Sequence, residues 1–151
     1  MHRISDPLEL LTQQHDDLLA LLDALASANE TVRNHALADL ADQLPDHLAA
    51  EQELLYPCVT GYLARPVFEE LIVEHTEIKR VLADLLWFGL DDVDSPRRIS
   101  ELRTLLEGHA AYQDHELFEN AAESMAPIDI TVLGNRLHAW FVAPVELPKA
   151  A

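Results

Sequence analysis

The stretch that decides the fold is LELLTQQHDDLLALL, residues 8–22. Its apolar positions recur at steps of three and four residues, and His15 occupies one of them, between Leu11 and Leu18. That spacing is the buried stripe of an amphipathic helix, because about 3.6 residues make one helical turn. We therefore predict a helix here that carries one histidine on its buried face.

The same interruption of an apolar stripe occurs once in each of three later segments, at His47, His75 and His109. Glu51 follows His47 by four residues, which places a carboxylate one turn away on the same helix face. Burying four imidazoles and a carboxylate without a cation would cost several kcal/mol. A shared metal site therefore explains the pattern better than four separate hydrogen-bonded core histidines.

Other histidines and aromatic residues are assigned to the surface or to core packing. Three histidines without a partner at ligand spacing are predicted to be solvated: His2, His35 and His138. Tyr56, Trp87 and Trp140 are interpreted as packing residues. Tyr112 lies three residues after His109 and faces the core near the predicted metal, as a packing residue or as a contact of the site.

Composition and charge narrow the class of protein. The 151 residues are 49% hydrophobic, glycine is scarce and β-branched runs are short, which favours one helical domain over residues 1–151. The net charge of −17, from 10 basic and 27 acidic residues, makes nucleic acid and anionic membranes poor partners. One cysteine, Cys58, and no stretch long enough to span a bilayer predict a cytoplasmic protein. The oligomeric state is left open.

The predicted fold is all-α, an up-down-up-down antiparallel four-helix bundle over about residues 5–124 with a short C-terminal fifth helix in the extension 125–151. Short loops between long helices imply antiparallel neighbours. The first helix opens at Ser5-Asp6-Pro7 and runs to about Ala28. The other segments are expected at about 31–59, 65–90 and 95–124, and a shorter one after Pro127. Pro45 is expected to kink or divide the second helix, Asp129 to cap the fifth, and the tail from Pro144 to be loose.

The distances of the four histidines from the predicted helix ends place them at one height in the bundle. At roughly 1.5 Å per residue, the mismatches between neighbouring helices amount to only ~3–5 Å. We therefore expect the four imidazoles to share one layer. Imidazole ligands suit iron, zinc, copper or nickel.

The order His15, His47-x3-Glu51, His75, His109-x4-Asp114 resembles the hemerythrin-like (HHE cation-binding) family, and so do HLAAEQELLYP at 47–57 and HAAYQDHELFE at 109–119. The resemblance covers all but the last thirty or so residues. It implies two non-haem iron ions as an oxo- or hydroxo-bridged pair. The ligands it implies are His15, His47, Glu51, His75, His109 and Asp114.

The chain departs from the family in two places. Leu71 stands where reversible oxygen carriers have a second histidine, one turn before His75. Gln113 stands where many relatives have glutamate, four residues after His109. Helix phase favours Gln113 and Glu116 over Asp114, so an Asp114 ligand requires this helix to be rotated or overwound, for example at a bulge. The carboxylate of the fourth helix therefore stays open between Asp114 and Glu116.

These residues predict a non-haem di-iron protein that binds dioxygen or nitric oxide, or an enzyme that decomposes peroxide. Leu71 favours peroxide, because an iron with fewer protein ligands leaves room for both peroxide oxygens. The alternative from another class is an iron, oxygen or redox sensor that acts through a separate partner protein. A zinc or manganese site is a third possibility, although six ligands suit a carboxylate-bridged pair better than a closed tetrahedral zinc site.

Overall fold

The structure of the chain is a computed structural model that describes residues 6–142, and the regular elements in that range are all helical. The long helices are α1 (Pro7–Ala24), α2 (Glu30–Ala50), α4 (Arg65–Phe88), α5 (Ser95–Tyr112) and α7 (Pro127–Val142). The shorter ones are α3 (Tyr56–Val59) and α6 (Phe118–Ser124). Two π-helical turns, Glu51–Leu55 and Gln113–Leu117, join α2 to α3 and α5 to α6, and a 3-10 turn, Thr60–Tyr62, follows α3. Ser5, His2 and the tail predicted from Pro144 lie outside the described residues.

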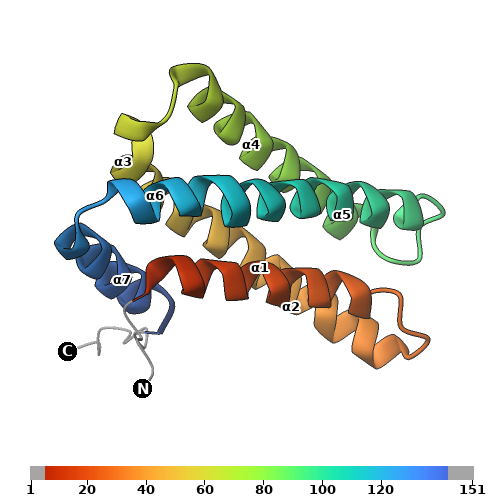
Figure 1. Cartoon of the computed structure of the whole chain (residues 1–151). Coiled ribbons are helices and arrows are strands. Elements are labelled where there is room, and N and C mark those ends of the chain that lie inside the picture. The colour runs from red at the N-terminus through yellow and green to blue at the C-terminus, as the bar shows by residue number, and fades with distance from the viewer. Residues whose placement is uncertain (1–5, 143–151) are drawn as a thin grey trace, which may run out of the picture.

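Four of the long helices close into a ring of neighbours. Helix α1 packs against α2 and α5, and α4 packs against the same two helices (Figure 1). Helix α7 lies at the end of this group where α1 begins, and it contacts α1. Local signals set the ends of these helices: the Asp6 carboxylate accepts hydrogen bonds from the first turn of α1, and Gly89 ends α4 at a φ of 82°. The fold class predicted from the sequence is thus confirmed as all-helical over the described residues.

Several local predictions were wrong. Helix α1 ends at Ala24, short of the predicted Ala28, because the chain needs the intervening residues to turn into α2, whose first turn is capped by Asn29. Helix α2 is not divided at the exposed Pro45, and the change from α-helical hydrogen bonding comes later, at the first π turn. A kink at Pro45 stays a prediction. Helix α7 begins at Pro127, so that Asp129 lies inside its first turn and does not cap it.

The fifth helix was predicted to be shorter than the others, and α7, with 16 residues, is shorter than the other four long helices, which have 18 to 24. Trp87 was interpreted wrongly, because its side chain is 85% exposed at the end of α4. It follows the buried Leu85 by two residues, which turns it to the opposite side of the helix. Trp140 packs as expected against the apolar cluster that α7 helps to form, and its indole N–H donates to Asp46 at 2.9 Å.

The core consists of two apolar clusters with a polar layer between them. One cluster includes Leu18, Leu44, Ile78 and Leu106. The other includes the following residues on the same helices or their continuations: Leu11, Leu55, Leu71 and Leu117. Each of the four histidines lies in the sequence between one member of each cluster, so the fold surrounds the histidine layer with aliphatic side chains above and below. Within residues 6–142, no helix is long and apolar enough to cross a membrane.

Candidate metal centre

Four histidines from four helices meet in the polar layer. His15 comes from α1, His47 from α2, His75 from α4 and His109 from α5. Each is at most 2% exposed, and their ring centroids are 4.8 to 6.1 Å apart for the pairs in contact. The one-layer arrangement expected from helix lengths is therefore what the packing produces.

Glu51 lies at the centre of this layer and is fully buried. Its Oε1 atom is 3.0 Å from Nε2 of His109, 3.1 Å from Nε2 of His47 and 3.6 Å from Nε2 of His75. Its Oε2 atom is 3.8 Å from Nε2 of His15. One carboxylate is thus surrounded by the same ring nitrogen of all four histidines.

The other ring nitrogen of three histidines is held from outside by an acceptor. Nδ1 of His109 is 2.6 Å from Glu74 Oε1, Nδ1 of His15 is 2.9 Å from Asp114 Oδ1, and Nδ1 of His47 is 2.7 Å from Gln14 Oε1. Carboxylate and amide oxygens only accept hydrogen bonds, so each Nδ1 must carry the proton. In the neutral imidazoles the Nε2 lone pair therefore faces Glu51, which is the tautomer that a metal requires.

His75 reaches the same state by a different contact. The Tyr56 hydroxyl accepts a hydrogen bond from the Gln113 amide at 3.0 Å, and it lies 2.9 Å from His75 Nε2, to which it can donate its own hydrogen. Nε2 of His75 is then an acceptor too. In their neutral forms, the four histidines would therefore each present an Nε2 lone pair to the interior of the layer.

The electrostatics of the metal-free layer centre on Glu51 and His109. Burial alone would raise the pKa of Glu51, but the adjacent His109 and His47 imidazoles bring it well below its ordinary value. Burial likewise opposes the charged form of His109, yet the Glu51 and Glu74 carboxylates raise its pKa to about 10. Burial lowers the pKa of His47 despite the neighbouring Glu51. Without a metal, the layer therefore holds a Glu51–His109 ion pair with one proton where a cation could bind.

The site has two halves with the same layout, one from α1 and α2 and the other from α4 and α5. One π turn belongs to each half. Glu51 is four residues after His47, and Gln113 is four residues after His109; each begins a π turn in which the backbone N–H five residues later bonds its carbonyl. Gln14 precedes His15 and contacts His47, just as Glu74 precedes His75 and contacts His109. The halves differ in charge: the first has an inner Glu and an outer Gln, and the second has the reverse.

Tyr56 is a site residue that the sequence analysis missed. It is nine residues after His47, and about 100° per residue would place it on the opposite side of an ideal helix. The π turn adds an extra residue to one turn and brings the Tyr56 ring into the layer, 1% exposed. Phe118 stands in the equivalent place after His109, where it stacks on His15 at 7° between ring planes. The shared spacing of nine residues was the available signal.

Four residues that follow His109 are candidates for contact with the metal, and they differ in burial and in hydrogen-bond partners: Tyr112, Gln113, Asp114 and Glu116. Gln113 is fully buried in the layer, and its amide reaches Tyr56. Asp114 lies outside His15, where it accepts from Nδ1 of that residue and from the Thr12 hydroxyl at 3.0 Å. Glu116 is exposed and Tyr112 is half-buried. The expected distortion is present, as a π turn, which is wider than an α turn and not overwound.

The donor set fits a bound cation. His15, His47, Glu51 and His109 each offer one ligand atom, and these atoms lie within 4.8 Å of one another. Nε2 of His15, Nε2 of His47 and Oε2 of Glu51 are buried with no hydrogen-bond partner among the described residues. Leaving such atoms unsatisfied costs about 1–3 kcal/mol each. Coordination to a metal would satisfy all three, with Nδ1 partners already in place to orient the rings.

Residues 6–121 match the family model described as the hemerythrin HHE cation binding domain. This match covers most of the chain and includes every residue of the layer, so the chain belongs to this family. Neither the curated proteins nor the solved structures give a match. The family assignment and the buried His–Glu group together indicate a cation-binding protein.

Proposed function

We propose that this hemerythrin HHE domain holds two non-haem iron ions and reacts with peroxide or binds a small diatomic ligand. The observation that carries the proposal is the Glu51 carboxylate between four inward-facing Nε2 atoms. Imidazole and carboxylate donors suit iron, and a carboxylate between two histidine pairs suits a pair of ions.

In this proposal His15 and His47 would hold one ion, His75 and His109 would hold the other, and Glu51 would contribute its carboxylate. The internal repeat supports this division, because each pair comes from equivalent positions of the two halves. Asp114 is the sixth proposed ligand, in line with the family resemblance. It now bonds the outer nitrogen of His15, so it would orient that ring, and it would have to rotate away from Nδ1 to join the inner set.

The proposed up-down-up-down course of the bundle follows from the same layer. Helices α1 and α4 meet the cluster of Leu11 and Leu71 before their histidines, whereas α2 and α5 meet the cluster of Leu44 and Leu106 first. This alternation supports antiparallel neighbours. We also propose a cytoplasmic protein, on the grounds of a single cysteine, and a small diatomic molecule or peroxide as its ligand.

Iron would supply open coordination positions and one-electron redox steps. The chain's contribution begins with Leu71, which is 4% exposed in an apolar cluster and offers no ligand one turn before His75. The half of the site with His75 and His109 therefore has fewer nitrogen donors than a reversible oxygen carrier has. Space beside His75 would be left for a small oxygen ligand.

Tyr56 and Gln113 line that half of the site, where they can donate and accept hydrogen bonds. The Tyr56 hydroxyl can donate to His75 Nε2 and accepts from the Gln113 amide. Burial, with the Glu51 charge nearby, raises the pKa of Tyr56 above its ordinary value, so the phenol keeps its proton in the metal-free site. Metal binding at His75 would free that hydrogen-bond donor to face a ligand. These features favour peroxide turnover over reversible dioxygen storage.

The test is to load the protein anaerobically with ferrous iron and record absorption spectra before and after dioxygen, nitric oxide and peroxide are added. We expect a reaction with peroxide that repeats over many equivalents, and irreversible oxidation by dioxygen. An oxygenated form that releases dioxygen under vacuum would overturn the peroxide assignment. An iron-loaded protein inert to all three ligands, with a fold that depends on iron, would favour the sensing alternative.

A further inference from the structure

The layer is closed to solvent, so a metal ion needs a way into it. His15, His47, Glu51 and His109 are 2%, 2%, 0% and 0% exposed. Two apolar clusters cover the layer on its upper and lower sides, and a hydrated cation would pay a large desolvation cost to cross either one. A route for metal must therefore pass between helices at the height of the layer itself.

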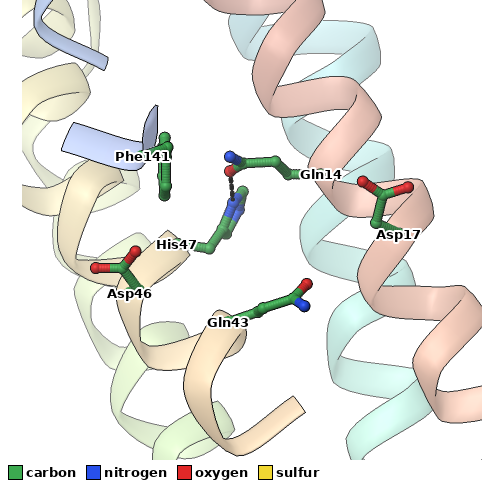
Figure 2. Close-up of a pocket in the computed structure, with 6 residues that line it drawn as sticks. All are labelled: Gln14, Asp17, Gln43, Asp46, His47 and Phe141. Carbon is green, nitrogen blue, oxygen red and sulfur yellow. Dashed lines mark hydrogen bonds between the residues drawn. The ribbon is translucent and has the colours of Figure 1, made fainter. Parts of the chain in front are cut away.

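A cavity of about 270 Å³ lies at this height, beside His47. Its lining residues come from α1, α2 and α7, as Figure 2 shows: Gln14, Asp17, Gln43, Asp46, His47 and Phe141. The space is enough for several water molecules. The cavity is thus large enough to admit a divalent cation with part of its hydration shell.

His47 connects this cavity to the layer. Its Nδ1 atom bonds Gln14 Oε1 at 2.7 Å, the dashed contact in Figure 2, and its Nε2 atom is 3.1 Å from Glu51 Oε1. Nε2 is buried and has no hydrogen-bond partner within residues 6–142. The same imidazole therefore forms part of the cavity wall and ends at the central carboxylate.

The chemistry of the cavity favours cations. Asp17 and Asp46 contribute two exposed carboxylates, Gln14 and Gln43 contribute amide oxygens, and none of the six lining residues is Lys or Arg. The Asp46 carboxylate is held by the Trp140 indole N–H at 2.9 Å. Oxygen donors of this kind exchange readily with the waters of a divalent ion, whereas an anion would be repelled.

We propose that this cavity is the loading route by which divalent metal reaches the histidine layer. Asp17 and Asp46 attract the hydrated ion, the Gln14 and Gln43 amides replace part of its water, and His47 is the first imidazole it meets. The inference rests on the proposed metal-binding function and adds to it a path and the residues that set the loading rate.

The test measures the rate at which metal-free protein takes up Co²⁺, followed by stopped-flow absorption at low ionic strength. The route variant is Asp17→Asn/Asp46→Asn, which keeps the oxygen that accepts from Trp140. The control is Asp16→Asn/Glu123→Gln, which removes the same charge from exposed positions outside the cavity. A third variant, Asp17→Lys, places a cation at the mouth.

We expect the route variant to load roughly three- to tenfold more slowly than the control, Asp17→Lys to be slower than wild type, and the difference to shrink in high salt. The amount of cobalt bound at equilibrium should be equal in wild type, route variant and control. Equal loading rates in the route variant and the control would overturn the route. Failure of the wild-type protein to bind cobalt or iron at all would instead overturn the proposed function.

Discussion

Replacing Glu51 by glutamine should remove most of the metal affinity of the layer. The carboxylate lies within 3.8 Å of Nε2 in all four histidines, and it is the only carboxylate among the fully buried residues described. In metal sites, loss of an outer partner costs about 10–100-fold in affinity. Loss of the charged group at the centre of the histidine layer should exceed that range, so we expect at least about 100-fold, or about 3 kcal/mol.

The internal repeat of the site supplies a matched control for this substitution. Gln113 occupies in the second half the place that Glu51 has in the first, so Gln113→Glu adds a carboxylate at the equivalent position. We expect Gln113→Glu to bind metal at least as tightly as wild type. The double variant Glu51→Gln/Gln113→Glu should recover a large part of the loss.

Affinities can be compared by titrating metal-free proteins with Co²⁺ against a chelator of known affinity, with circular dichroism to check that each variant is folded. The reasoning is refuted if folded Glu51→Gln binds within about threefold of wild type. It is also refuted if the double variant is weaker than Glu51→Gln, because the two inner positions would then not be equivalent. Either result would place the metal away from the centre of the layer.

Three further predictions follow from the described contacts. Metal uptake at pH 7 should release at least one proton, because His109, with a pKa of about 10, is protonated in the metal-free layer and must lose that proton to bind metal. The apparent metal affinity should therefore rise with pH. Calorimetry in two buffers of different ionisation enthalpy measures the proton release, and a release of zero would contradict this prediction. Asp114→Asn should weaken metal binding about 10–100-fold, because His15 loses its carboxylate partner. Glu116→Gln changes an exposed residue and should leave the metal affinity in a chelator titration unchanged. A larger loss of affinity in Glu116→Gln than in Asp114→Asn would favour the helix-phase argument. Trp87→Ser should change the unfolding free energy by no more than about 0.5 kcal/mol in a urea titration, since the side chain is 85% exposed, and a loss of several kcal/mol would return Trp87 to the core.

The periodicity of the sequence predicted the helices and the histidine layer because both depend on short-range spacing. Steps of three and four residues identify a buried helix face whatever its neighbours are, and a histidine on that face must be buried when the helices pack. His15, His47, His75 and His109 all satisfy this rule. Helix lengths then set the common height, and no knowledge of side-chain contacts was needed.

The residues that sequence reasoning placed wrongly or missed depend on local departures from the ideal helix. Tyr56 enters the layer only because a π turn shifts the helix phase after Glu51, and an argument from 3.6 residues per turn cannot locate such a turn. The outer partner Gln14 was also missed, because it acts across a helix pair on His47, and not on a neighbour in sequence. Trp87 was taken for a core residue on its type alone.

The central claim is that the four histidines and Glu51 hold a pair of iron ions. The most direct measurement is the iron content of anaerobically loaded protein, with a Mössbauer spectrum to detect coupling between the ions. We predict two coupled irons per chain, most of which is lost in His47→Ala and in His109→Ala and kept in His35→Ala, whose histidine is exposed on α2. A single uncoupled iron in wild type, or full occupancy in His47→Ala and His109→Ala, would contradict the account.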